Sequence, residues 1–275
     1  MGFYPFQSQR QKVMSIYING DGDFTSVQAA IDSVPDGNSQ WVIIHIRKGV
    51  YTEKVHIPKN KPYIFLRGIG RGRSAIVESP NFIAFGVSFK NEAPTGVAYT
   101  SHNQLVAAFV AADKVAFYHC AFYSTHNTLF DFKGRHYYDN CYIQGSIDFI
   151  FGRGRSVFHS CEIFVISDKR VTIHGSITAQ NRESANENSG FVFVKTVVPK
   201  GWTNWSYDGT TEGVFKLDSN KERMYHVEFK TFKCHGPGAE SQQRAPWSKE
   251  LTEKEAAPFL SIDYINGEEW LPVWP

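Results

Sequence analysis

A repeat with a period of about twenty residues constrains the fold of this chain more than any other feature. Three segments share the form aromatic-x-x-Cys-x-apolar: Phe117–Phe122, Tyr138–Ile143 and Phe158–Ile163. Short strands that recur at this period, without the two-residue turns of hairpins, are typical of a parallel β-helix, in which each coil of the chain stacks on the one before. An all-β sandwich is the alternative, but its turn signals usually recur every 8–12 residues or so.

Hydrophobic periodicity predicts one short helix and otherwise strands. Apolar residues at helical spacing between Val27 and Val34 follow Thr25 and Ser26, either of which suits a helix N-cap. Alternating or continuous apolar runs predict strands at 41–46, 63–67, 82–89, 115–122, 136–143, 157–166, 171–179 and 191–198. We therefore expect an all-β fold, a right-handed single-stranded parallel β-helix with a short N-terminal helix and a helical or loop C-terminal tail. Residues 1–14 are expected to form an extension outside the core domain, 15–275.

Composition excludes several classes of protein. The 29 basic and 27 acidic residues leave a net charge of +2, too weak to indicate a nucleic-acid partner. No apolar run approaches the ~18 residues that a membrane span needs. The first twenty residues also lack the apolar segment of a secretory signal, so the sequence alone predicts a chain that is not exported. Four cysteines without C-x-x-C spacing predict no structural zinc, and no metal or other cofactor is expected.

The repeat also aligns the cysteines. Cys120, Cys141 and Cys161 are 21 and 20 residues apart, and stacked coils lie about 4.8 Å apart. Cys120 and Cys141 would then be close enough for a disulfide. A column of buried thiols acting as small hydrophobic side chains is the other interpretation, and the sequence leaves both open.

Polar residues recur with the same period. Asn127 lies seven residues after Cys120, and Asp148 lies seven residues after Cys141. One coil earlier, 23 residues before Asn127, the chain carries Gln104 in an otherwise apolar segment, so we expect these three side chains to line up on one face. A stacked polar ladder explains this pattern structurally.

The functional interpretation of the ladder is a reactive carboxylate. Asp148 stands in the apolar segment GSIDFIFG, where loss of water would raise its pKa, beside amides that stabilise a developing oxyanion. Asp148 would attack the carbonyl carbon of a carboxylic ester, and Gln104 would donate to the tetrahedral oxygen. Asp168 has the same spacing after Cys161, but a loop is expected to intervene there.

The segment YIQGSIDFIFG, 142–152, resembles the aspartate-containing signature of the plant and bacterial pectinesterases, which de-esterify methylated galacturonan. The resemblance extends over nearly the whole chain. Further matching segments lie at 20–35 (GDGDFTSVQAAIDSVP), 49–53 (GVYTE), 104–107 (QLVA), 177–180 (ITAQ), 201–202 (GW), 236–238 (GPG) and 251–260 (LTEKEAAPFL). The family's fold is a right-handed parallel β-helix, which agrees with the repeat.

This resemblance implies that Asp148 is the nucleophile and that Gln104 is an oxyanion-hole donor. The sequence His126-Asn127-Thr128-Leu129 stands where the family has Q-D-T-L, so Asn127 occupies the position of the family's acid/base aspartate. An amide cannot transfer that proton, and His126 is the candidate substitute. The family's L-G-R segment, whose arginine holds the nucleophilic carboxylate, has no match between Asn181 and Trp202. Turnover by this chain is therefore expected to be weak.

The resemblance also implies a substrate, partners and a location. Pectin is the expected substrate of a monomer that acts in the cell wall and meets a protein inhibitor, and Phe149 is an expected substrate-binding residue. Trp202 and Trp205 are further substrate-binding candidates as a platform for sugar rings, and packing in the core explains these two side chains equally well. A weak or inactive relative that binds polygalacturonate or serves as a decoy is the alternative. A lyase or hydrolase that uses Asp148 with Asp168, or calcium, is the least favoured interpretation.

Overall fold

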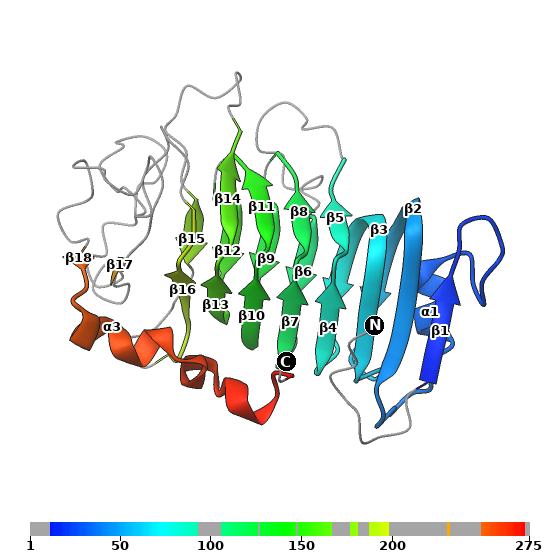
Figure 1. Ribbon diagram of the computed structural model, residues 1–275, viewed down its shortest axis with the longest axis horizontal. Helices are drawn as coiled ribbons and strands as arrows, with labels where there is room; N and C mark the ends of the chain where they lie inside the picture. Colours follow the sequence, from blue (N-terminus) through cyan, green and yellow to red (C-terminus); the bar gives the residue numbers. More distant parts are fainter. Residues whose placement is uncertain are drawn as a thin grey trace.

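Parallel strand pairing joins nearly all of the described chain in the computed structural model (Figure 1). The structure describes residues 12–92, 106–125, 127–146, 148–166, 177–180, 187–197, 230–231 and 249–272. Each strand pairs in parallel with the strand at the same place in the next coil. The chain is a parallel β-helix, so the predicted fold class is confirmed.

The first coils contain long strands and the later coils contain three short ones each. β1 (Lys12–Ile16) pairs with β2 (Val42–Ile57), which pairs with β3 (Ile64–Val77). β1 is thus already part of the coil stack, although the domain was expected to begin at residue 15. The register of these strands places Val42 beside Ile64 and Ile57 beside Val77.

Beyond β3 the short strands form three rows. The β10 row consists of β4 (Phe82–Phe85), β7 (Val115–Tyr118), β10 (Arg135–Asp139), β13 (Arg155–His159) and β16 (Gly190–Val194). The β11 row consists of β5 (Ser88–Lys90), β8 (Ala121–Tyr123), β11 (Tyr142–Gly145) and β14 (Glu162–Val165). The β9 row consists of β6 (Ala108–Val110), β9 (Leu129–Asp131), β12 (Ile150–Gly152) and β15 (Thr178–Gln180). A separate pair contains β17 (Lys230–Thr231) and β18 (Lys249–Glu250).

Single left-handed residues separate the β10 row from the β11 row. His119, Asn140 and Ser160 have φ angles of 50°, 51° and 51°, and each lies one residue before a cysteine of the repeat. The segments 115–122, 136–143 and 157–166 were each predicted as one strand, which is wrong, because this corner divides each of them into two strands. The sequence hid the break because a single left-handed residue, and not a glycine or a proline, turns the chain at each of these corners.

Stacked aromatic rings and thiols fill the interior. Tyr138 lies between Phe117 and Phe158, with ring centroids 5.2 Å and 4.5 Å apart and planes within 5° of parallel. Cys120, Cys141 and Cys161 are buried free thiols, so the structure adopts the thiol column and not the disulfide. Burial raises the pKa of the Cys141 thiol well above its usual value, which leaves it in the unreactive protonated form.

The N-terminal end is closed by the predicted helix, α1 (Val27–Asp32). Its N-cap is Ser26, whose side chain accepts a hydrogen bond from Ala29 N. The Glu53 carboxylate accepts from the backbone N–H groups of Val27 and Gln28 at 2.8 and 2.9 Å, which satisfies otherwise unpaired donors at the helix terminus. None of the helices in the described ranges is long and apolar enough to cross a membrane.

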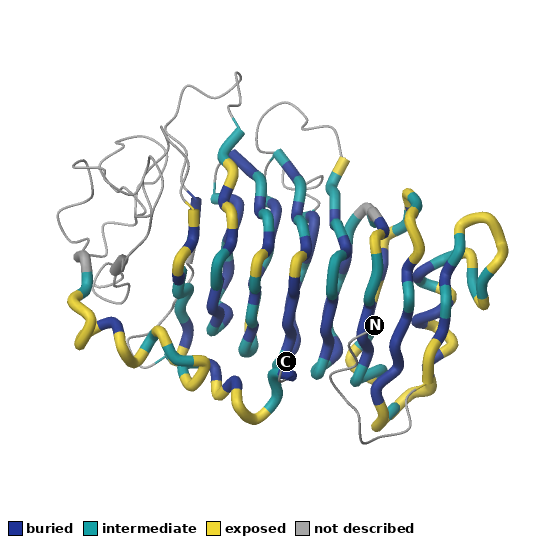
Figure 2. Tube along the Cα trace, viewed as in Figure 1, coloured by how far each residue is buried: buried dark blue, intermediate teal, exposed yellow. Residues whose placement is uncertain are grey.

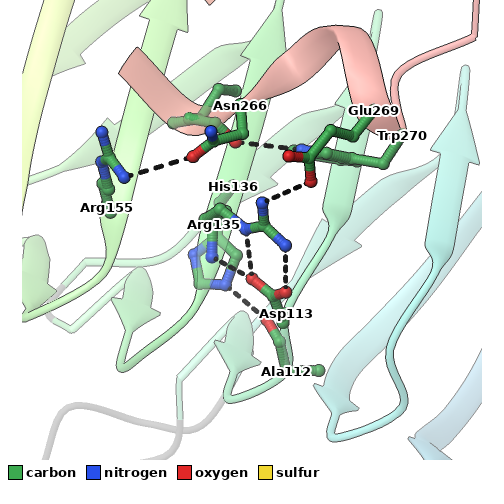
Figure 3. Close-up of polar contacts among 9 residues, drawn as sticks. Ala112, Asp113, Arg135, His136, Arg155, Asn266, Glu269 and Trp270 are labelled. Carbon is green, nitrogen blue, oxygen red and sulfur yellow. Dashed lines mark hydrogen bonds and ion pairs between the residues drawn. The ribbon is translucent and has the colours of Figure 1, made fainter. Parts of the chain in front are cut away.

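A C-terminal segment packs against the β10 row, where Figures 1 and 2 show it running along one edge of the coil stack with many exposed residues. It contains α3 (Glu253–Leu260) and the 3-10 helices η1 (Ile262–Ile265) and η2 (Gly267–Glu269). Arg135 on β10 holds this segment by pairing with Glu269 at 3.2 Å and with Asp113 on the preceding coil at 2.6 Å (Figure 3). The predicted helical tail is confirmed for the described residues.

Close packing explains the first glycine of GSIDFIFG. A Cβ added to Gly145 would lie 2.3 Å from the Cβ and Cγ atoms of Phe149, whose side chain is fully buried. Any larger residue at position 145 would have to displace this ring from the core. Gly145 thereby allows the chain to fold back over β11 before it enters β12.

We predict that Gly145→Ala lowers the free energy of unfolding by roughly 1–3 kcal/mol, because the added methyl group overpacks the core. Urea denaturation of both proteins measures the difference. Gly72→Ala is the matched control, since a Cβ there meets nothing closer than the Ser88 carbonyl oxygen at 3.9 Å. A Gly145→Ala variant as stable as the control would contradict this account.

Candidate active site

Asn127 and Asp148 occupy the same position in consecutive coils. The register pairs Leu129 of β9 with Ile150 of β12, and each polar residue lies two positions before its strand partner. Both residues are half-buried, so their side chains keep contact with solvent. The alignment expected from the repeat is therefore present, at a spacing of about 4.8 Å between coils.

The backbone at both residues is left-handed. Asn127 has a φ of 49° and Asp148 a φ of 44°, a region that non-glycine residues enter at a cost of order 1–3 kcal/mol. Hydrogen bonds on either side hold the coils in place: Leu129 N donates to Phe149 O at 2.8 Å, and the buried Thr128 hydroxyl donates to Gln144 O at 2.7 Å. Strain of this kind at solvent-accessible polar residues is typical of functional sites.

The apolar residues beside Asp148 face away from it. Phe149 and Ile150 are both completely buried in the core. Because the Phe149 ring cannot reach a sugar on the surface, its assignment as a substrate-binding residue is wrong. The hydrophobic run of GSIDFIFG is explained by packing inside the coil, and Asp148 itself is only half-buried.

Outward-facing aromatic side chains lie next in the chain, and the sequence interpretation missed them. Phe130 and Phe151 alternate with buried neighbours on β9 and β12 and stack with ring centroids 4.5 Å apart. Phe109 on β6 extends the stack, 5.0 Å from Phe130. Each of Phe130 and Phe151 lies three residues after the polar residue of its coil. The available signal was that successive side chains of a strand point to opposite faces, so the middle residue of each short strand, 129–131 and 150–152, must point outward when its two neighbours point inward.

The pairing of β6 with β9 has a different offset from the one used to align Gln104 with Asn127. β6 pairs Ala108 with Leu129, an offset of 21 residues, whereas an offset of 23 was used to align Gln104 with Asn127. Counted back along the coil, position 106 corresponds to Asn127. The offset changes in the next coil, where Ile150 pairs with Thr178, so position 176 corresponds to Asp148 when counted back along that coil.

Four of the predicted site residues lie outside the described residues: Gln104, His126, Trp202 and Trp205. Asp168 and part of the interval in which the L-G-R segment was sought also lie there. Within the described ranges, no three His, Cys, Asp or Glu side chains gather as a metal site would require. The geometry of the site therefore consists of Asn127, Asp148 and the adjacent aromatic stack.

Comparison with known proteins gives the family of this chain. The family model described as Pectinesterase matches residues 13–199. The chain belongs to the pectinesterase family. It is 55% identical to "Probable pectinesterase 67" of Arabidopsis thaliana, over 94% of this chain and 84% of that protein, and 33% identical to "Pectinesterase 31" of Arabidopsis thaliana, over 95% and 94%.

Solved structures show the same fold. Pectin methylesterase from carrot superposes with a TM-score of 0.76 at 24% identity, covering 95% of this chain and 96% of that chain. A pectin methylesterase solved in complex with a hexasaccharide gives a TM-score of 0.72 at 19% identity, covering 95% and 98%. At these identities the likeness supports the parallel β-helix of this pectinesterase-family chain.

Two residues of the family's G-x-Y-x-E motif have structural roles in this chain. Glu53 binds the N-terminus of α1, as described above, and the Tyr51 hydroxyl donates to the Arg47 carbonyl at 2.9 Å. Both lie in β2, at the N-terminal end of the coil stack, away from the coils of Asn127 and Asp148. In this chain, these two side chains therefore stabilise the first coils.

A second group of polar residues lies inside the β-helix. The Asp131 carboxylate accepts hydrogen bonds from His136 Nδ1 at 3.0 Å, the Tyr138 hydroxyl at 2.8 Å and the Ser156 hydroxyl at 2.8 Å. All four side chains are fully buried. Gly154 allows the carboxylate to fit, since a Cβ there would lie 1.6 Å from Asp131 Oδ1.

Although Asp131, His136 and Ser156 have the residue types of a hydrolase triad, their arrangement does not fit one. His136 Nε2 faces the Ala112 carbonyl oxygen at 2.8 Å (Figure 3), so both ring nitrogens face hydrogen-bond acceptors. No atom of the trio is exposed to a substrate. These residues join adjacent coils, and only the doubly protonated form of His136 can donate to both acceptors.

The charge state of His136 follows from its surroundings. Burial lowers the pKa of His136, but the Asp131 carboxylate, its hydrogen bond, the Ala112 carbonyl and the more distant Asp113 raise it, and the pKa lies above its usual value of 6.5. A raised folded-state pKa stabilises the protein fully below about pH 6.5, and this contribution is lost as the pH rises through the folded-state pKa.

We predict that Asp131→Asn lowers the free energy of unfolding by roughly 3–5 kcal/mol at pH 6, because it leaves a buried charge unpaired. The variant should also lose less stability than the natural chain as the pH rises above 6.5. Urea denaturation at pH 6, 7 and 8 measures both effects.

Asp139→Asn is the control for this prediction. Asp139 pairs with His159 at 2.6 Å, but both side chains are partly exposed, so we expect a loss of about 1 kcal/mol or less. Equal pH slopes for the natural chain and Asp131→Asn would show that this carboxylate does not set the charge of His136.

Proposed function

We propose that this chain hydrolyses the methyl esters of galacturonan in pectin and releases methanol. The observation that carries the proposal is the register of β9 and β12, which stacks Asn127 and Asp148 at half-buried, left-handed positions of adjacent coils. Family membership supports the reaction class, since the matched model is Pectinesterase. The hexasaccharide complex of a structural relative supports an oligosaccharide ligand for this fold.

Asp148 acts as the nucleophile in this proposal. Its carboxylate oxygen attacks the ester carbonyl carbon, the tetrahedral oxyanion accepts hydrogen bonds from amide donors such as Gln104, and the C–O bond to methoxide breaks. The leaving methoxide takes a proton to become methanol. Water then attacks the acyl-enzyme, which restores Asp148 and yields a free galacturonate carboxylate.

Asn127 limits the rate in this mechanism. General acid catalysis is typically worth about 10²–10⁴ in rate, and the Asn127 amide can orient the ester but cannot supply the proton. His126 is the substitute proton donor, since an imidazole titrates near neutral pH. The chain is therefore proposed to be a slow esterase in the absence of an acid at position 127.

The aromatic stack supplies the proposed sugar platform. Phe130 and Phe151 present partly exposed rings three residues after Asn127 and Asp148, and aromatic rings combine apolar surface with a defined geometry for ligands. Trp202 and Trp205 remain proposed substrate contacts. We further propose that the protein acts as a monomer in the cell wall and is recognised there by a protein inhibitor.

A weak or inactive relative that binds polygalacturonate, or a decoy, is the second candidate considered from the sequence. The replacement of the family's acid/base aspartate by Asn127 and the unmatched L-G-R segment favour it. Methanol release and pectin binding, measured on the same preparation, distinguish the esterase from the non-catalytic relative. Binding without methanol release would contradict the esterase proposal.

We predict that Asp148→Asn folds normally and releases no methanol from methylated pectin, because an amide keeps the shape of the side chain but is not a competent nucleophile. Circular dichroism checks the fold, and a methanol assay checks activity. Gln104→Ala is the companion variant, expected to slow turnover by roughly 10²–10³. Unchanged methanol release from Asp148→Asn would remove Asp148 from the nucleophile role.

We predict that Asn127→Asp alone recovers little activity, because the L-G-R arginine that would hold Asp148 is still missing. Restoring the aspartate together with an L-G-R segment should recover much more. The comparison is methanol released by the three forms at matched folded concentration. Robust turnover by the natural chain would instead identify His126 as the acid, and His126→Ala would then abolish that turnover.

A further inference from the structure

Two cations lie near one aromatic ring that adjoins the aromatic stack of the candidate site. Lys133 Nζ lies 5.9 Å from the centroid of the Phe132 ring, and Arg153 Cζ lies 5.4 Å from it. Both distances lie within the usual range of cation–π contacts. We call Phe132, Lys133 and Arg153 the cationic rim.

The rim is continuous with the aromatic stack of the candidate site. The Phe132 ring lies 5.3 Å from Phe130 and 5.8 Å from Phe109. Arg153 N donates to Phe132 O at 3.2 Å, which places Arg153 beside Phe132 on the next coil. Phe132 and Arg153 each follow the polar residue of their coil, Asn127 or Asp148, by five positions. At about 3.3 Å per extended residue, the separation is at most ~16 Å, within reach of one oligosaccharide.

The rim is accessible and carries two basic side chains. Lys133 is exposed, and Phe132 and Arg153 are half-buried. The nearest carboxylate in the sequence, Asp131, points into the interior and is fully buried, so it does not neutralise Lys133 at the surface. An anionic group that approached Phe132 would meet two cations held beside an apolar ring.

We propose that the cationic rim binds a uronate unit that carries a free carboxylate. Methyl-esterified galacturonate is neutral and free galacturonate is anionic, so two cations at one end of the platform distinguish them by charge. The Phe132 ring contacts the apolar face of the same sugar. The proposal deepens the proposed function, on which it rests for the identity of the polysaccharide, and adds Lys133 and Arg153 as residues that set a preference among pectins.

The test measures binding of de-esterified oligogalacturonate by calorimetry to the natural chain and to Lys133→Met, Arg153→Met and the double variant. Loss of one surface ion pair should weaken binding about fivefold, and loss of both roughly 10–30-fold. Lys133→Arg keeps the charge and should bind within about twofold of the natural chain. Lys254→Met, which removes an exposed cation from α3 on another face, is the matched control.

A neutral ligand provides the second arm. Fully methyl-esterified oligogalacturonate, measured in the Asp148→Asn background so that it is not consumed, should bind the rim variants as tightly as the parent. An equal loss for charged and neutral ligands, a double variant within twofold of the natural chain, or an equal loss in Lys254→Met would each overturn the proposal.

Methanol release separates this proposal from the proposed function. If the rim binds ligands according to their charge in a chain that releases no methanol, the proposal for the cationic rim stands and the esterase proposal is rejected. If the natural chain releases methanol and the double variant binds oligogalacturonate as tightly as the natural chain does, the esterase proposal stands and the proposal for the cationic rim is rejected. The thermal unfolding midpoint of each variant is measured as well. A midpoint equal to that of the natural chain shows that a loss of affinity does not reflect a loss of fold.

Discussion

Backbone hydrogen bonding between successive coils is the interaction on which the rest of this structure depends. Each short strand has only three to five residues, and no such strand is stable alone. Stacking gives each row a continuous ladder and buries a continuous column of side chains, among them the rings of Phe117, Tyr138 and Phe158. The same stacking sets the position of Asp148 relative to Asn127, so core and site share one register.

The sequence was sufficient to predict this register where the repeat is regular. Cys120, Cys141 and Cys161 gave the correct offsets because equivalent residues in stacked coils must face the same environment. The alignment of Asn127 with Asp148 followed from those offsets. It did not extend to Gln104, because the 23-residue offset used there was chosen to reach a polar residue, whereas β6 and β9 keep the regular offset of 21 residues.

Other features could not be predicted because they depend on single backbone conformations. His119, Asn140 and Ser160 share a left-handed φ but no residue type, so no sequence signal marked the corner between strands. Phe149 follows a left-handed residue, and its direction depends on the space above Gly145. The interior position of Asp131 likewise depends on partners from two other strands, which the sequence separates by as many as 25 residues.

The three thiols of the described coils are reduced and enclosed by the core. Assembly of these coils therefore requires no oxidant and no disulfide isomerase, and a reducing bacterial cytoplasm should support it as well as an oxidising compartment would. Because Cys120, Cys141 and Cys161 become accessible to a thiol-reactive dye only when adjacent coils separate, these residues are built-in reporters of local opening at the centre of the stack.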